Sequence, residues 1–393
     1  MTGDGTMGQQ VETRSVPTLA DVPAEAWDAL VLADGLYMSH AWLKALESDP
    51  AATPTYLLAY RDGRLDGALP LYEVHEVHNS FYGPERYLAQ LRTEGRWLLV
   101  GTHSAYRSGV PLRGDLTPEE RVATTGALVT AAVTIARERG ARGVVSLFTP
   151  TAAAELLVRC GGVAALDTAE GLLETGGRTL DEVLAGLPRH RRNRLRHEVD
   201  VFDAAGYEVA TESLDGCVDE LAPLLRNVQV RYGHEASVEG MRDYLGGLLA
   251  AGDAWVVFSL REEGRLVGAA VMHPCGSTLF ARLVGFDYAA LRDAYEYFGL
   301  AYYEPVRWMA EHGLTSLHLG IEAYDAKVLR GARLHPLWTV AVPVDPTDAP
   351  RPGAPDVAAW TERYGTAAPA DAWRVPWLDD ETPNPASDER SAP

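Results

Sequence analysis

The chain has 393 residues, of which 47% are hydrophobic and 23% charged, and its formal net charge is −20. These values describe a globular protein long enough for two domains, and the acidic balance argues against broad binding to nucleic acid or anionic membranes. There is no run of about 18 apolar residues and no CxxC pair among the three cysteines, so we expect a cytoplasmic protein without a transmembrane span, metal or disulfide framework.

The first half of the sequence predicts a mixed pattern of strands and helices. Residues 1–10 lack a basic region and an apolar stretch, which predicts a disordered leader rather than a secretory signal. Residues 55–74 predict two strands joined by an Asp-Gly turn, a pair typical of hairpins. Residues 117–140 predict the clearest helix, with a capping box at its start and glycine at its end. A buried strand is expected at 143–148.

The second half repeats this order of elements. Its turn sequence GRLVGAAV agrees with GRLDGALP of the first half at five of eight positions. In each half a long helix ending in glycine follows, and then a short strand. We expect a helix over 292–313, with a kink near Pro305, and strands at 255–273 (a pair), 277–286, 314–320 and 337–344. This repetition predicts a duplicated α/β domain, with boundaries at 11–178 and 179–345.

The composition changes after residue 345. Residues 346–393 form a C-terminal extension rich in proline and aspartate. Its tryptophans are Trp360, Trp373 and Trp377. They predict that 356–378 packs back onto the body, whereas 379–393 is expected to be disordered.

The stretch LPRHRRNRLRHEV, residues 187–199, concentrates positive charge on an acidic chain. Five arginines fall on one predicted helix: Arg189, Arg191, Arg192, Arg194 and Arg196. Guanidinium groups suit phosphate oxygens, which favours a phosphate-rich ligand such as tRNA, a nucleotide-linked substrate or a CoA-like donor. The alternative is a solvated helix face that pairs with local acids such as Glu198 and Asp200.

The order strand, Phe-Asp-Tyr loop, helix, strand, loop, helix and strand over 283–338 resembles the second domain of the FemAB family. The basic helix and the following DAAGYEV strengthen the resemblance, which is clearest over 180–342 and fainter over 35–150. It implies an α/β (α+β) protein with two tandem GNAT-like domains, each a mixed, mostly antiparallel sheet flanked by helices. FemA-type coiled-coil insertions and the glycine loop of acetyl-CoA-binding GNAT domains are absent, which weakens acetyl-CoA as the donor.

The resemblance also implies a mechanism and candidate residues. Many FemAB members transfer an aminoacyl group from aminoacyl-tRNA to an amine, a reaction that needs an oriented carbonyl and a stabilised oxyanion but no covalent nucleophile. Arg330 matches a basic residue before glycine in the family and would stabilise the oxyanion or the leaving ribose, with Lys327 as a second candidate. Asp287 would bind or deprotonate the amine. Substrate-binding candidates are Tyr106, Arg107, Glu322 and Tyr324.

We therefore expect an enzyme that uses aminoacyl-tRNA as co-substrate and no other cofactor. The arginine helix would contact the tRNA acceptor stem, and the acceptor would be a small amine or hydroxylamine of natural-product (antibiotic) biosynthesis or a peptidoglycan precursor. A different donor, acyl-CoA or an acyl-carrier protein, is the first alternative. The second is a protein without catalysis that binds a ligand or scaffolds a pathway.

Overall fold

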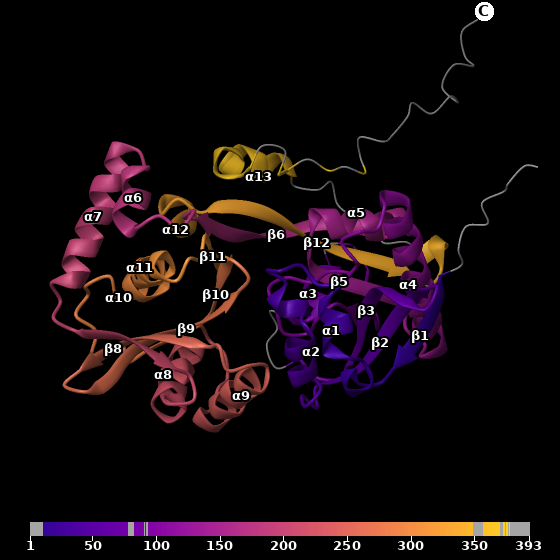
Figure 1. The fold of residues 1–393 in the computed structure, drawn as a ribbon, viewed down its shortest axis with the longest axis horizontal. Coiled ribbons are helices and arrows are strands. Elements are labelled where there is room, and N and C mark those ends of the chain that lie inside the picture. The colour runs from indigo at the N-terminus through magenta and orange to yellow at the C-terminus, as the bar shows by residue number, and fades with distance from the viewer. Residues whose placement is uncertain are drawn as a thin grey trace, which may run out of the picture.

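The computed structural model describes residues 11–77, 82–89, 91, 93–348, 357–369, 372–373, 375 and 377. The leader expected at 1–10 and the tail expected at 379–393 lie outside these residues. The described chain forms one twelve-stranded sheet with helices on both faces (Figure 1). The order of its strands is β1-β2-β3-β4-β5-β12-β6-β11-β10-β9-β8-β7.

The elements alternate along the chain as a mixed α/β protein requires. The strands are β1 Glu12–Val16, β2 Ala52–Arg61, β3 Arg64–Val74, β4 Leu98–Val100, β5 Gly143–Pro150, β6 Val163–Glu174, β7 Glu208–Ser213, β8 Val256–Glu262, β9 Arg265–Cys275, β10 Thr278–Phe286, β11 Ser316–Ile321 and β12 Arg333–Pro343. The helices are α1 Ala24–Asp28, α2 His40–Leu46, α3 Pro84–Leu88, α4 Pro118–Glu138, α5 Thr151–Arg159, α6 Leu180–Ala185, α7 Arg189–Asp203, α8 Val218–Arg231, α9 Val238–Ala250, α10 Glu296–Phe298, α11 Glu304–Glu311, α12 Tyr324–Leu329 and α13 Val357–Tyr364.

In the first half of the protein, the hairpin turn and the helix start predicted from local sequence patterns both form. Asp62 and Gly63 join β2 to β3 with φ angles of 51° and 77°, the left-handed pair that a tight hairpin turn needs. Thr117 and Glu120 form the expected capping box, in which each side chain accepts from the other residue's backbone N–H, at 3.2 and 2.9 Å. The long helix α4 then packs across β2 and β3.

The second half repeats this arrangement and confirms the duplication. Glu263 and Gly264 join β8 to β9 with φ angles of 50° and 77°, and β10 and β11 then pair in parallel as β4 and β5 do. The helix predicted over 292–313 begins only at Glu296. Near Pro305 a π-helical stretch, Gly299–Tyr303, takes the place of the expected kink, because proline has no backbone N–H to continue the regular ladder.

The two halves share the centre of the sheet. Strand β12, the last of the second half, pairs with β5 of the first half, and β6 of the first half pairs with β11 of the second. Strands β6 and β12 pair with each other along most of their length, so they join both halves in one sheet. The boundary expected at 178/179 falls between β6 and α6, although β12 extends beside the strands of the first half.

The C-terminal extension packs back onto the body, as its tryptophans predict. The Trp360 ring lies 5.1 Å from the ring of Tyr324 on α12, and Trp377 lies 4.9 Å from Trp338 on β12. Helix α13 therefore lies over α12 (Figure 1).

Candidate active site at the junction of the two halves

In the second half of the protein, the parallel strands β10 and β11 pair over only part of their length. Strand β10 pairs with β11 only from Thr278 to Phe280, although both strands continue. A bulge between Ala281 and Leu283 also shifts the register of β10 against β9 and leaves Arg282 out of the ladder. A charged side chain is thereby placed at the opening between the two strands, where the halves of the protein meet.

Arg282 crosses from the second half to the first. Only 5% of it is exposed, and its guanidinium donates to the Tyr244 hydroxyl at 2.8 Å, the Tyr82 hydroxyl at 3.2 Å and the Ser104 carbonyl at 3.2 Å. It also lies within 6 Å of the ring centres of Tyr37, Trp42 and Tyr106. Within the described residues no carboxylate pairs with it, so hydroxyls and aromatic faces balance the buried charge.

The groups around Arg282 keep its guanidinium protonated. Burial lowers its pKa, but the surrounding tyrosine hydroxyls outweigh burial and raise it above the usual value. The Tyr37 hydroxyl and the Trp42 indole N–H beside it are buried and find no hydrogen-bond partner in the described part of the chain. Buried polar atoms without partners are uncommon in folded proteins and mark places where water or a ligand can bind.

Glu170 on β6 is the second charged centre. Only 1% of it is exposed, and it accepts from Arg107 Nη2 at 2.6 Å and from His318 Nε2 at 2.9 Å. Burial raises the pKa of Glu170, but Arg107 and His318 outweigh burial and lower it to about 2. Burial lowers the pKa of His318. At neutral pH the site therefore holds an ionised glutamate bonded to a neutral imidazole.

The third charged centre is Lys327 on α12. Its Nζ donates to the carbonyls of Gly320 at 2.8 Å and Ile321 at 2.7 Å. Burial lowers the pKa of Lys327 to about 7, and the nearby carboxylates of Glu322 and Glu170 oppose this only in part. Both protonation states of this amine are therefore populated near neutral pH.

The loop that Lys327 binds has an unusual backbone. Gly320, Glu322 and Ala323 have φ angles of 67°, 63° and 48°. Left-handed conformations cost about 1–3 kcal/mol each for residues other than glycine, and they concentrate at functional sites. The lysine therefore stabilises a strained turn at the end of β11.

Aromatic rings connect these centres into one group, which we call the junction cluster: Arg107, Glu170, Arg282, His318 and Lys327. The Tyr37 ring lies 6.3 Å from the His318 ring and 5.8 Å from the Arg282 guanidinium. The Tyr106 ring packs over Gly320 and lies 4.9 Å from Arg282. Fixed charges, neutral hydroxyls and a titratable amine thus share one buried region.

The structure brings most predicted substrate residues to this cluster. Tyr106 and Arg107 line it, and Tyr324 hydrogen-bonds the Thr168 hydroxyl on β6, beside Glu170. The Glu322 side chain is 61% exposed, at the outer edge of the strained turn, 3.8 Å from Arg86.

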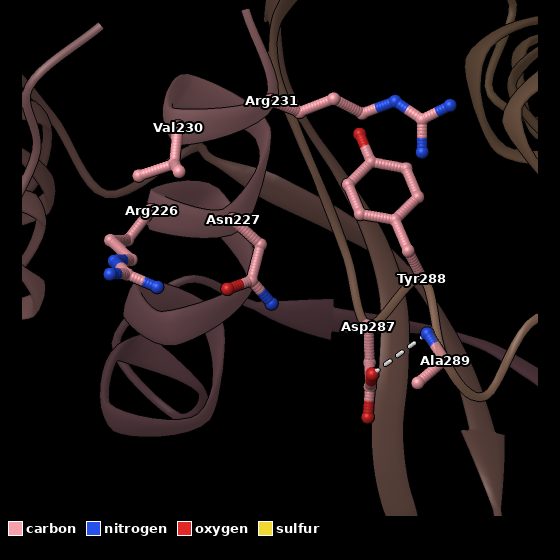
Figure 2. A pocket seen from close by; sticks show the side chains of 7 residues that line it. All are labelled: Arg226, Asn227, Val230, Arg231, Asp287, Tyr288 and Ala289. Carbon is pink, nitrogen blue, oxygen red and sulfur yellow. Dashed lines mark hydrogen bonds between the residues drawn. The ribbon is translucent and has the colours of Figure 1, made fainter. Parts of the chain in front are cut away.

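Two predicted catalytic residues lie elsewhere. Arg330 is 3% exposed, forms an ion pair with Glu198 on α7 and stacks 3.2 Å from the Phe298 ring, so its charge serves the packing of α7 on α12. Asp287 pairs with Arg265 at 2.6 Å and lines an open pocket beside α8 (Figure 2). The backbone N–H of Arg330 donates to the Lys327 carbonyl at 3.0 Å at the end of α12, but within the described residues no side-chain hydrogen bond or ion pair links Arg330 or Asp287 to Lys327.

The basic helix forms as α7, but three of its five arginines bind their own protein. Arg191 donates to the carbonyls of Val328 and Leu329 at the end of α12. Arg192 donates to the Ala185 and Leu187 carbonyls at 3.2 and 3.4 Å, and Arg194 pairs with Glu198. Arg189 and Arg196 are exposed and have no partner in the described chain. The expected phosphate-binding face is therefore smaller than the sequence indicates.

Sequence reasoning missed Glu170, Arg282 and His318. The signal for the last two was a charged or polar residue within an otherwise apolar strand, STLFARLVGF and SLHLG. A second signal concerns Lys327: the sequence contains only two lysines, Lys44 and Lys327, against a large excess of arginine. Lysine changes its pKa readily when it is buried, whereas arginine stays charged, so a lysine in a part of the chain that becomes buried is a candidate for a titratable amine.

The described residues show no cluster of three or more His, Cys, Asp or Glu arranged to hold a metal ion. Nor do they contain a helix long and apolar enough to cross a membrane.

Comparisons with known proteins show which fold and family this chain resembles. The tandem GNAT protein from the clavulanic acid biosynthesis pathway shares 12% identity over 86% of this chain and 99% of its own, with a TM-score of 0.52. FemX shares 12% sequence identity over 85% of this chain and 96% of its own, with a TM-score of 0.54. A conserved protein of unknown function from Bacteroides thetaiotaomicron VPI-5482 shares 16% sequence identity over 85% of this chain and 100% of its own, with a TM-score of 0.53. These likenesses confirm the expected tandem GNAT fold.

A comparison with curated proteins finds none that matches significantly. The model of the FemAB-like family, described as peptidoglycan biosynthesis/recognition, matches residues 18–347. That range covers strands β2 to β12 of the sheet and the whole junction cluster. The chain therefore belongs to the FemAB-like family.

Proposed function

We propose that the protein is an acyltransferase that moves an aminoacyl group from aminoacyl-tRNA to an amine or hydroxylamine acceptor, either a peptidoglycan precursor or a small natural-product intermediate. Membership of the FemAB-like family and the likeness in fold to FemX and to a tandem GNAT protein support this class of reaction. The observation that carries the proposal is the buried amine of Lys327, whose pKa of about 7 suits proton transfer at neutral pH.

The reaction needs one proton to move. The acceptor nitrogen attacks the ester carbonyl, the N–C bond forms, and the C–O bond to the ribose breaks. Neutral Lys327 accepts the proton that the nitrogen loses and then delivers it to the leaving ribose oxygen. Arg107 and Glu170 hold fixed charges beside it, and because the region is buried these charges act with little screening by water.

The remaining predicted residues take other roles in this proposal. Arg107 is 25% exposed and lies 3.8 Å from Asp34, so it connects the buried cluster to solvent, and we assign it with Tyr106 to acceptor binding. Arg330 and Arg191 both connect α7 to α12, the helix that carries Lys327. We therefore assign Arg330 to positioning Lys327. Asp287 has no part in the transfer.

The donor would bind on the outer face of α7. Arg189 and Arg196 are seven residues apart and share one face of the helix, where both guanidiniums remain available for phosphates. Arg191 and Arg330 connect α7 to α12. A tRNA bound to the outer face of α7 would therefore contact the helix that packs against the one carrying the proposed catalytic Lys327.

Changing Arg189 and Arg196 to alanine is expected to weaken the retention of an aminoacyl-tRNA pool in a filter-binding assay. The slope of log affinity against log salt should fall by about 2, since each lost phosphate contact contributes about 0.9. Arg242→Ala is the matched control, because Arg242 is an exposed arginine on α9 that pairs with Asp219. Equal retention and equal slopes for the double variant and the control would rule out α7 as the donor surface.

A further inference from the structure

An open cavity of about 340 Å³ lies away from the junction cluster, between the end of α8 and the segment that follows β10. Arg226, Asn227 and Arg231 line it from α8, and Asp287 and Tyr288 line it from the opposite side (Figure 2). The amide of Asn227 donates to the Phe286 carbonyl at 3.1 Å and so holds the two sides together. Its volume lies at the low end of the range of small-ligand sites, and because it is open to solvent a ligand bound there would stay partly exposed.

The cavity carries a net positive charge. Arg265 neutralises the carboxylate of Asp287 at 2.6 Å. Arg226 has no hydrogen bond or ion pair with any described residue, and the only contact of Arg231 there is the face of the Tyr288 ring, 4.2 Å from its guanidinium carbon. Two guanidiniums without counter-ions give this part of an acidic chain a local positive charge, which favours an anionic ligand.

One aromatic side chain, Tyr288, lines the opening, and further aromatic residues lie close to it in the chain or in the packing. Tyr232, next to Arg231, is 74% exposed, and Tyr297 on α10 is 40% exposed. The rings of Tyr288 and Tyr297 lie 6.0 and 6.4 Å from the ring of Phe286. Exposed aromatic rings beside unpaired arginines form the surface on which nucleobases stack while their phosphates are neutralised.

We propose that this cavity binds a nucleotide unit, with its phosphate on Arg226 and its base on the stacked pair of Arg231 and Tyr288. Figure 2 shows the two arginines at opposite ends of the cavity, with Asn227 and Tyr288 between them. A ligand with an anionic end and a flat aromatic end matches this arrangement. Its source is either a free nucleotide or an unpaired nucleotide of an RNA strand. The inference does not depend on the transfer reaction, because it concerns binding alone.

Titration calorimetry of the full chain with AMP, adenosine and the trinucleotide CCA tests the assignment of each arginine. AMP is expected to bind at millimolar concentration or tighter. Arg226→Ala should lower the affinity for AMP by about tenfold, to that for adenosine, because a charge-assisted contact is lost. Arg231→Ala should weaken AMP and adenosine alike, by about tenfold, because the base loses its stacking surface.

Arg242 lies on α9 away from the cavity, so the Arg242→Ala variant is the matched control and should bind AMP as the wild type does. Thermal unfolding of the three variants should show that each of them is folded. Tighter binding of CCA than of AMP, sensitive to both variants, identifies an RNA strand as the source, and equal binding identifies a free nucleotide. The proposal is overturned if neither AMP nor CCA binds at millimolar concentration, or if Arg226→Ala and Arg231→Ala bind AMP as the wild type does.

Discussion

Replacing Lys327 with methionine is expected to lower the rate of aminoacyl transfer by ~10²- to 10⁴-fold, the usual contribution of a positioned general acid or base. Methionine keeps the volume of the buried side chain but removes the amine that would accept the proton. The rate of aminoacyl hydroxamate formation from aminoacyl-tRNA and hydroxylamine measures the effect. Lys44→Met is the matched control, because Lys44 is the other lysine of the sequence and pairs with Glu47 away from the cluster.

The pH dependence of this rate gives a second test of the lysine. Only the neutral amine accepts a proton, so the wild-type rate should rise as pH increases through about 7 and then level off. The residual rate of Lys327→Met should lack this step. A wild-type profile without a step near pH 7, or a variant that keeps it, would assign the proton transfer to another group.

The same lysine should make stability depend on pH. Lys327 has a pKa of about 7 in the folded state against a usual value of 10.5, so between these values the unfolded chain binds a proton that the folded protein does not. Stability therefore rises with pH across this window. Relative to Lys327→Met, the wild type should gain about 2 kcal/mol in unfolding free energy between pH 7 and 9, as measured by urea unfolding.

Replacing Glu170 with glutamine is expected to lower the unfolding free energy by about 3–5 kcal/mol, because it leaves the partly buried Arg107 without its main counter-charge. The amide also accepts less strongly from His318. Urea unfolding at neutral pH measures the loss. Glu155→Gln is the matched control: Glu155 pairs with Arg159 on the surface of α5, where such a pair contributes about 0–1 kcal/mol. Equal losses in both variants would contradict the account of the cluster.

The Glu170 contribution should disappear in acid. The folded state lowers the pKa of Glu170 from 4.5 to about 2, so its stabilisation is complete above pH 4.5 and is lost as pH falls through about 2. The stability difference between the wild type and Glu170→Gln should therefore shrink over this window. A difference that stays constant from pH 5 to pH 2 would show that Glu170 is not ionised by Arg107 and His318.

The sequence predicted those parts of the fold that depend on neighbouring residues. The Asp62-Gly63 turn and the Thr117 capping box each rest on contacts within a few residues, and both formed as expected. The sharing of β6 and β12 between the halves was not predicted, because strand pairing across more than 150 residues leaves no local pattern. The repeat indicated two similar halves but not one continuous sheet.

The candidate site was predicted only in part for the same reason. Lys327 and Arg107 could be proposed from the family resemblance, whereas Glu170 joins them only because β6 passes between the halves. The arginine helix shows the opposite error. The sequence presents Arg191 as a surface charge, but its partners are the carbonyls at the end of α12, 137 and 138 residues away. Backbone acceptors at such separations are invisible in a charge pattern.

The central claim is that this chain transfers an aminoacyl group from tRNA at the junction of its two halves. The most direct test is to incubate the purified protein with a labelled aminoacyl-tRNA pool and hydroxylamine, and to measure hydroxamate formed above the spontaneous rate. The account predicts protein-dependent product that RNase treatment of the donor abolishes and that acetyl-CoA does not replace. Product formed from acetyl-CoA, or no product above the spontaneous rate from either donor, would contradict it.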